Sequence, residues 1–145
     1  MDHLVYCDGK AKVLEKILNG TKTMIIRGNV SRKLPYGRVF KGETLYLIEN
    51  RGDGLIKGRA IVKSVFNSER LEDAELKEVV NKNMEKLNLT EDQVTRILGK
   101  RFLCLVEIEN AEEIEVSLKH NHQRNMDDWI IVENISSLIE ETSNI

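Results

Sequence analysis

Two basic residues close together in the chain, Lys22 and Arg27, have the types and spacing expected of an anion-binding site. The stretch from Val13 to Leu18 places apolar residues on one helix face. Gly20 predicts the end of that helix, because glycine tolerates the left-handed conformation that follows a last turn. Lys22 then lies just beyond a helix C-terminus, whose partial negative charge favours a cation. We expect Lys22 to face a ligand.

Arg27 closes a β-rich segment that begins at Thr23. Side chains alternate between the two faces of a regular strand, so Arg27 is expected on the face opposite to Lys22 unless a twist or bulge intervenes. Two alternatives follow for Arg27. It ties the sheet to an acid such as Glu43 or Glu49, or it lines one cleft together with Lys22.

Charge is unevenly distributed along the chain. The segment from Gly20 to Gly42 carries six basic residues and no acid, a charge of +6, although the whole chain has a net charge of −2. Residues 107–145 carry ten acids against two bases, a charge of −8. Such separation lets one surface attract a polyanion. The acidic C-terminal third is either a solvated surface or a face that binds a protein partner.

Further candidate ligand-binding residues follow Arg27. They are Arg32, Lys33, Tyr36 and Arg38 on a long loop, and Arg59 on a later strand with Lys57 and Lys63. Basic side chains bind phosphates, and an aromatic ring offers a base one stacking surface. Aromatic residues make up only 5% of the chain, too few for a platform that stacks several bases. A flexible basic loop and the solvated face of a strand are the alternatives.

Other residues that could do chemistry lack a second signal. His120 and His122 would share one face of a strand, but no further ligand has metal-site spacing, so we expect no metal and no cofactor. Cys7 and Cys104 are far apart in apolar runs, which suits a reducing, cytoplasmic compartment. We expect no secretory leader, and no apolar run reaches the ~20 residues that cross a bilayer, so no membrane contact is expected either.

The elements that would position these residues fit one domain over residues 1–145. The patterns predict strands over residues 4–7, 23–27, 44–48, 56–66, 102–109, 114–118 and 129–132. Helices are expected at 13–18, twice between 68 and 99, and at 136–141. Consecutive strands joined by short turns favour antiparallel pairing. The predicted fold class is α+β: a small, mixed, mostly antiparallel β-barrel with flanking helices.

Three local signals refine this outline. Ser68 is expected to cap the first of the two middle helices. Thr90 and Gln93 have capping-box spacing for the second helix. Trp129 is expected to be buried where the sheet closes.

The residues from Gly20 to Arg27 resemble the ASCH family of PUA-like domains. The family pattern is a helix that ends in Gly-x-Lys, an acidic or hydroxyl residue three positions further on, and then Arg. Gly20, Lys22 and Arg27 match it, and Lys41 to Leu45 is similar to the family's next strand. The resemblance covers roughly residues 4–109 and implies a PUA-like β-barrel with a role in RNA recognition or RNA metabolism.

The same resemblance implies two kinds of activity. Some members remove an acyl group from a modified cytidine with the motif lysine, a hydroxyl residue and a distant glutamate, and others have been proposed to be ribonucleases. By resemblance, the lysine is Lys22 and the glutamate is Glu85. Ile25 holds the position of the hydroxyl or acid and can neither attack a carbonyl nor transfer a proton. Thr23 points to the same side of the strand as Ile25 and is a further candidate ligand-binding residue.

Three hypotheses follow from the sequence. The first is a module that binds RNA or a nucleotide through Lys22, the basic loop and Arg59. The second is a small amidohydrolase that acts on an acetylcytidine-like nucleoside with Lys22 and Glu85. The third is a protein-interaction domain that uses the acidic C-terminal third. Ile25 favours the first.

Overall fold

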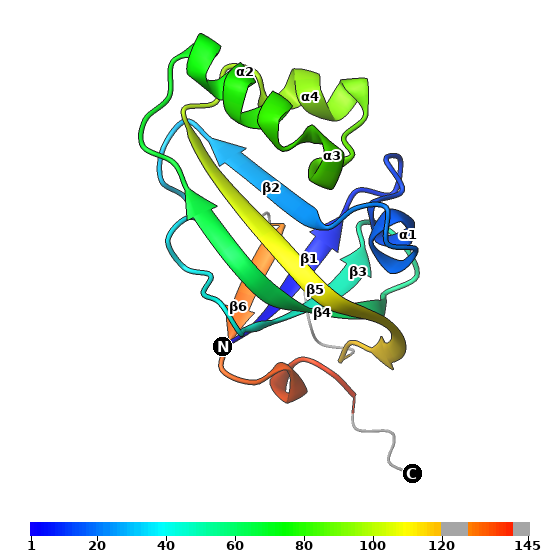
Figure 1. Ribbon diagram of the computed structural model, residues 1–145. Helices are drawn as coiled ribbons and strands as arrows, with labels where there is room; N and C mark the ends of the chain where they lie inside the picture. The colour runs from blue at the N-terminus through cyan, green and yellow to red at the C-terminus, as the bar shows by residue number, and fades with distance from the viewer. Residues whose placement is uncertain (120–127, 141–145) are drawn as a thin grey trace.

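The computed structural model describes residues 1–119 and 128–140, in which six strands form one curled sheet with short helices around it (Figure 1). The strands are β1 (Asp2–Cys7), β2 (Met24–Asn29), β3 (Thr44–Glu49), β4 (Leu55–Asn67), β5 (Phe102–Ser117) and β6 (Trp129–Val132). The helices are α1 (Val13–Leu18), α2 (Asp73–Lys82), α3 (Met84–Leu87) and α4 (Glu91–Ile97), followed by a 3-10 turn at Ile135–Ser137.

The sheet is mixed and mostly antiparallel, as expected. Its strand order is β2-β5-β4-β3-β1-β6, and only β1 and β3 run parallel. Strands β2 and β6 are the two edges of this sheet in the described residues. The fold is therefore a curled half-barrel, which fits the predicted small α+β barrel in its coarse features.

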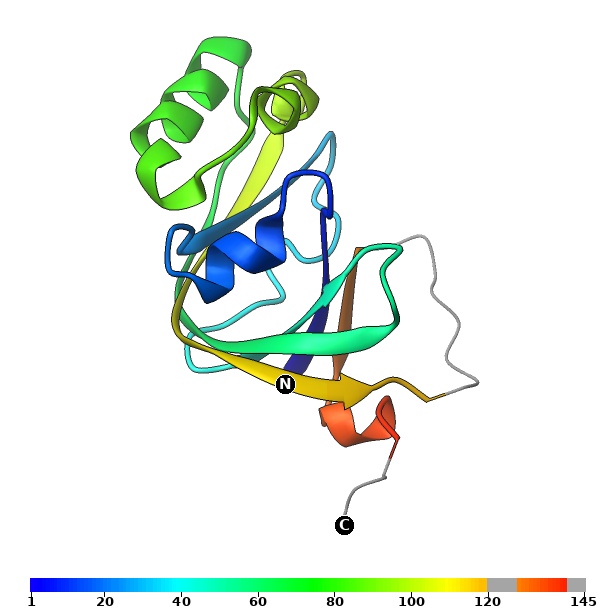
Figure 2. The same cartoon turned by 90° about the vertical axis from the view of Figure 1, so that its right-hand side faces the viewer.

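Strand β5 replaces two predicted strands. The alternating segments 102–109 and 114–118 belong to one strand of 16 residues, which pairs with most of β4. Asn110 lies between them with a φ of 53°, a left-handed conformation that asparagine adopts more readily than most residues. The pairing register of β4 and β5 shifts at three places, and such irregularities increase local twist. This long, bent strand curls the sheet (Figures 1 and 2).

Alternation along β2 divides the apolar residues between two cores. Ile25 belongs to the main core, which also holds residues of α1, β3 and Trp129. Met24 and Ile26 belong to a second core, with Leu76 of α2 and Leu87 of α3. Helices α2 to α4 therefore cover the outer face of β2 at one end of the sheet (Figure 2).

The helix signals had mixed outcomes. The capping box of α4 is confirmed, since Thr90 Oγ1 accepts from the Gln93 N–H at 3.2 Å. The prediction that Ser68 caps a helix is wrong. Helix α2 begins only at Asp73, after Glu72, and the Ser68 hydroxyl oxygen instead accepts from the Leu103 N–H at 2.9 Å.

Three further expectations concern the C-terminal part of the chain. Trp129 is buried, as predicted. His120 and His122 lie outside the described residues. The helix predicted at 136–141 is a single 3-10 turn that begins at Ile135.

In residues 1–119 and 128–140, no helix has both the length and the apolar character that a membrane crossing requires.

Candidate functional site

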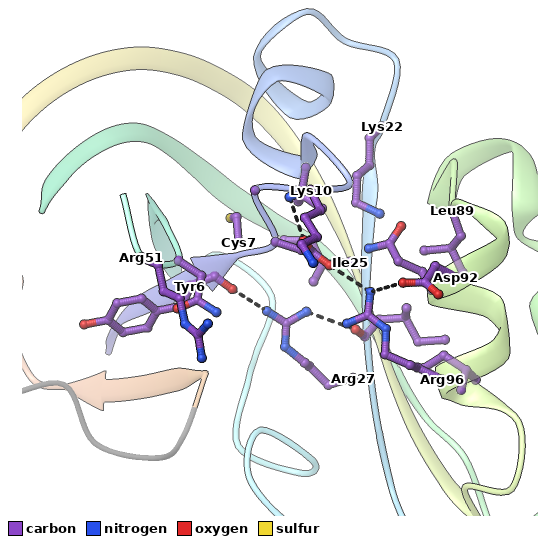
Figure 3. A pocket seen from close by; sticks show the side chains of 17 residues that line it. Tyr6, Cys7, Lys10, Lys22, Ile25, Arg27, Arg51, Leu89, Asp92 and Arg96 are labelled. Atoms are coloured by element: carbon purple, nitrogen blue, oxygen red, sulfur yellow. Dashed lines mark hydrogen bonds and ion pairs between the residues drawn. The ribbon is translucent and has the colours of Figure 1, made fainter. Parts of the chain in front are cut away.

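The structure contains a cavity of about 690 Å³ at the rim of the half-barrel (Figure 3). Segments far apart in the sequence line it: the end of β1 and the turn after it, the first half of β2, the turn after β3, and α4 with the residue before its cap. Its polar and charged lining residues are Asp8, Lys10, Lys22, Arg27, Asn50, Arg51, Asp92, Gln93 and Arg96. Its apolar lining includes Val13, Ile25, Leu89 and Ile97.

Lys22 lies in the wall of this cavity, and its side chain is only 3% exposed. The N–H groups of Thr21 and Lys22 both donate to the carbonyl of Lys16, which wraps the chain tightly after α1. The Lys22 ammonium donates to the carbonyl of Leu87, at the end of α3. Burial, and secondly the nearby cations Arg27 and Lys16, lower the pKa of Lys22 to about 8.

Arg27 enters the same cavity from β2, on the side of Ile25. Its Nη2 donates to the Tyr6 carbonyl at 2.9 Å and its Nη1 to the Ile26 carbonyl at 3.1 Å. Arg27 Nε is buried and has no hydrogen-bond partner in the described residues. Neither Glu43 nor Glu49 forms an ion pair with Arg27, so the predicted tie to one of these acids is wrong.

The two cations therefore share one cleft, contrary to the expectation for a regular strand. Strand β2 begins only at Met24, so Lys22 precedes the alternating part of the chain. Its direction is set by the turn after α1 and by the Leu87 carbonyl, not by the pleat.

A series of contacts through Trp129, His3 and Glu43 supports the Arg27 guanidinium. The guanidinium carbon lies 5.4 Å from the centre of the Trp129 ring, a cation–π arrangement. Trp129 Nε1 donates to His3 Nδ1 at 2.9 Å, and His3 Nε2 lies 2.8 Å from a carboxylate oxygen of Glu43. Because His3 Nδ1 accepts, neutral His3 carries its proton on Nε2 and donates it to Glu43. Burial lowers the pKa of His3, although Glu43 opposes this shift.

The rim of the cavity carries both signs of charge. Arg96 of α4 pairs with Asp8 at 2.9 Å and contacts Asp92 at 3.7 Å, so a pair of carboxylates compensates it (Figure 3). This ion pair first, together with N–H donors from the turn after β1, lowers the pKa of Asp8 against the effect of burial. Lys10 and Arg51 are exposed on the rim and form no ion pair in the described residues.

Sequence reasoning missed these rim residues. Asp8 and Arg96 are 88 positions apart, and Lys10 and Arg51 lie on turns after different strands. No local pattern reports such pairs. The parallel pairing of β1 with β3, which brings the turns after both strands to one edge of the sheet, is shown only by the structure.

Cys7 also lines the cavity, but its thiol is not a nucleophile at neutral pH. The residue is 1% exposed, and burial raises the pKa of the thiol to about 11. Among the described residues neither Cys7 nor Cys104 forms a disulfide.

The other residues predicted to bind a ligand lie outside this cavity. Tyr36 packs against Phe102 with ring centres 5.8 Å apart and donates to the Ser68 carbonyl, and Arg32 lies over the same Phe102 ring. Lys33 and Arg38 are exposed on the loop between β2 and β3. These contacts hold Arg32 and Tyr36 against the start of β5.

Three remaining candidates occupy separate places. Arg59 pairs with Glu112 across β4 and β5. Glu85 is exposed on α3 and is not among the lining residues. Thr23 is half-buried and connects through its backbone to Lys86 and Ile108. Of the predicted site residues, the cavity brings together Lys22 and Arg27.

Comparison with solved structures finds the same architecture elsewhere. The crystal structure of ASCH from Zymomonas mobilis matches with a TM-score of 0.70 and 13% identity, over 96% of this chain and 96% of that chain. Crystal structures of two of its single-residue mutants match with TM-scores of 0.70 and 12% identity, over 96% of this chain. The chain has the ASCH-domain fold.

This result confirms the architecture implied by the residues around Lys22. At 12–13% identity, the likeness to the ASCH structures concerns the fold alone. No protein-family model and no curated protein matches the chain.

Proposed function

We propose that this protein binds a nucleotide-like ligand, either free or as part of an RNA, in the cavity that contains Lys22 and Arg27. One observation carries the proposal: two cations from one short segment line a single cavity, and neither has a carboxylate partner in residues 1–119 and 128–140. A buried positive charge without a protein counterion favours an anionic or acceptor-rich ligand.

The size and composition of the cavity support a ligand of this class. Its volume of about 690 Å³ lies within the range of small-molecule sites. The apolar side chains of Val13, Ile25 and Ile97 offer contact surface to a base. Arg27 Nε and Asn50 Oδ1 are buried without a partner, so a donor and an acceptor are available in its wall.

The loop between β2 and β3 extends this proposal to RNA. Lys33 and Arg38 are exposed there, outside the cavity, where they could contact phosphates of a longer strand. Lys33→Glu is expected to weaken the binding of an oligonucleotide of any sequence and to leave the binding of a mononucleotide unchanged.

The test is a calorimetric titration of nucleosides, nucleotides and short RNAs into the wild type, Lys22→Met and Arg27→Gln. Each cavity variant is expected to lose about tenfold or more in affinity, because a hydrogen bond to a charged group contributes about 1.5–3 kcal/mol. Lys77→Gln, on the exposed face of α2, is the matched control. Binding that is equally strong in both cavity variants would rule out this site.

A second candidate function is favoured by the lowered pKa of Lys22, which is about 8. A lysine that is partly neutral near pH 7 can act as a general base. In this hypothesis Lys22 takes a proton from water and the water oxygen attacks the acyl carbon of an acetylcytidine-like nucleoside. The C–N bond then breaks, and the Lys22 ammonium returns the proton to the leaving amino group, so that acetate and the free nucleoside are released. Turnover of acetylcytidine that disappears in Lys22→Ala would support it, and no turnover at high protein concentration would exclude it.

A further inference from the structure

Two exposed cations, Lys10 and Arg51, line the mouth of the cavity that also contains the buried Lys22. Lys10 belongs to the turn after β1, and Arg51 belongs to the turn after β3. Figure 3 shows Arg51 and Arg96 on opposite sides of Arg27. The rim therefore carries three cations, of which Arg96 is paired with the lining acids Asp8 and Asp92.

The sheet topology explains why these two turns meet. Strands β1 and β3 are parallel neighbours, and Cys7 is in register with Glu49, so the two strands end at the same edge of the sheet. The N–H of Asn50 donates to the Cys7 carbonyl at 2.8 Å and joins the two turns. This hydrogen bond holds together the two turns that carry Lys10 and Arg51.

The charges of Lys10 and Arg51 differ from that of Arg96 in one respect. Arg96 is neutralised by Asp8 and Asp92. Neither Lys10 nor Arg51 forms an ion pair within the described ranges. The acids nearest to them along the chain are Asp8, Glu49 and Asp53. Asp8 pairs with Arg96 and Asp53 with Lys57, while Glu49, whose side chain packs against Gly9 and Gly52, is not a lining residue.

Arg51 also occupies an unusual backbone conformation. Its φ is 60°, in the left-handed region where glycine and asparagine are favoured. Residues in strained conformations cluster at ligand-binding sites.

We propose that the mouth formed by Lys10 and Arg51 binds the phosphate of a nucleoside monophosphate, while the base enters toward Ile25 and Arg27. This inference rests on the proposed function and specifies its ligand class. Two uncompensated cations match the dianionic charge of a phosphomonoester better than the single charge of a phosphodiester. The ligand is a free nucleotide or the phosphorylated end of an RNA, and an internal RNA segment is disfavoured.

The test compares each of the four nucleosides with its 5′-monophosphate by calorimetry at low salt. The wild type is expected to bind at least one monophosphate about tenfold more tightly than its nucleoside, as a charge-assisted contact contributes about 1.5–3 kcal/mol. Lys10→Gln and Arg51→Gln are each expected to reduce that preference about tenfold or abolish it, without weakening the binding of the nucleoside. Lys77→Gln is the control, and thermal unfolding verifies that all variants are folded.

A second arm separates the two sources of the phosphate. Short RNAs with a 5′-phosphate are compared with the same RNAs carrying a 5′-hydroxyl, and a preference that requires Arg51 indicates an RNA end. Equal binding of nucleoside and monophosphate, or a preference that both variants retain, would overturn this inference and leave the proposed function intact. Absence of binding by every nucleoside, nucleotide and RNA would overturn the proposed function as well.

Discussion

Lys22 combines near-complete burial with a positive charge, and this combination has a measurable cost. The unfolded chain holds the lysine proton up to about pH 10.5, whereas the folded protein releases it near pH 8. Between these values the unfolded state binds more protons than the folded state, so stability rises with pH. The desolvated charge therefore destabilises the protein at neutral pH, on the order of 3 kcal/mol.

The first prediction concerns the replacement Lys22→Met. From about pH 8 to about pH 10.5, the wild type should gain free energy of unfolding relative to Lys22→Met, because the variant has no proton to release. Urea unfolding at several pH values measures the difference, with Lys77→Met as the control. Parallel curves for the wild type and Lys22→Met would show that Lys22 titrates normally in the folded protein.

The agreement between the site predicted from the sequence and the observed site differs from residue to residue. Lys22 and Arg27 were identified from residue type and spacing, and both line the cavity. Their common orientation could not be predicted, because it depends on where β2 begins and on the distant Leu87 carbonyl. Tyr36 is a residue whose type suggested base stacking, but its ring packs on Phe102 and its hydroxyl bonds to Ser68.

At the scale of elements, one buried hydrogen-bond chain connects three parts of the sheet. His3 lies on β1, Trp129 on β6, and Glu43 immediately before β3. Protonation of His3 would replace the acceptor at Nδ1 with a second donor, directly opposite the Trp129 N–H. The chain therefore requires neutral His3.

A second prediction follows for acid conditions. The pKa of His3 is lowered from 6.5 in the folded protein, so its contribution to stability is complete above pH 6.5 and is lost as the pH falls below that value. The Glu43 carboxyl also lowers stability on acidification, at a lower pH. Burial raises the pKa of Glu43, but the contacts with His3 and the Phe40 N–H outweigh burial and lower it. The urea midpoint of the wild type should fall on acidification more steeply than that of His3→Gln. Equal slopes would exclude His3 as the titrating group.

The third prediction isolates the indole N–H of Trp129. Trp129→Phe keeps an aromatic ring but leaves the buried His3 Nδ1 without its donor, which should cost about 1–3 kcal/mol of unfolding free energy. Chemical denaturation at neutral pH measures the loss. A loss that remains after His3 is also replaced would attribute the effect to ring packing and not to the hydrogen bond.

The fourth prediction tests how α1 is held on the sheet. A Cβ at Gly58 of β4 would lie 3.2 Å from side-chain atoms of Leu14 and Leu47. Gly58→Val should therefore displace α1 and destabilise the protein by about 1–3 kcal/mol, and Gly58→Ala by less. Thermal unfolding of both variants gives the comparison. An unchanged melting temperature in Gly58→Val would show that α1 tolerates the displacement.

Elements were predicted well where a local pattern determines them and poorly where pairing does. Alternation located most strands, and the capping box located α4. The two halves of β5 were predicted as separate strands. The backbone between them has a left-handed φ at Asn110, and only the pairing with β4 joins both halves into one strand. Serine is a common helix cap, but the Ser68 hydroxyl oxygen instead accepts a hydrogen bond from the Leu103 N–H of β5.

At the scale of the whole molecule, the open sheet creates the site. The parallel ends of β1 and β3, the start of β2 and helix α4 meet at one rim, and each contributes lining residues to the cavity (Figure 3). The exposed acids of β5, including Glu109, Glu112 and Glu113, lie outside this lining. Of the six basic residues in the segment from Gly20 to Gly42, only Lys22 and Arg27 line the cavity, so the predicted charge separation is reproduced there only in part.

The most direct test of the Lys22–Arg27 cavity is a map of backbone amide chemical shifts, recorded by NMR while nucleoside monophosphates and short RNAs are titrated into labelled protein. We expect shifts at the turn after β1, at the start of β2, at the turn after β3 and along α4, and we expect them to disappear in Arg27→Gln. Shifts confined to the loop of residues 30–43 or to the acidic half of β5 would contradict this expectation.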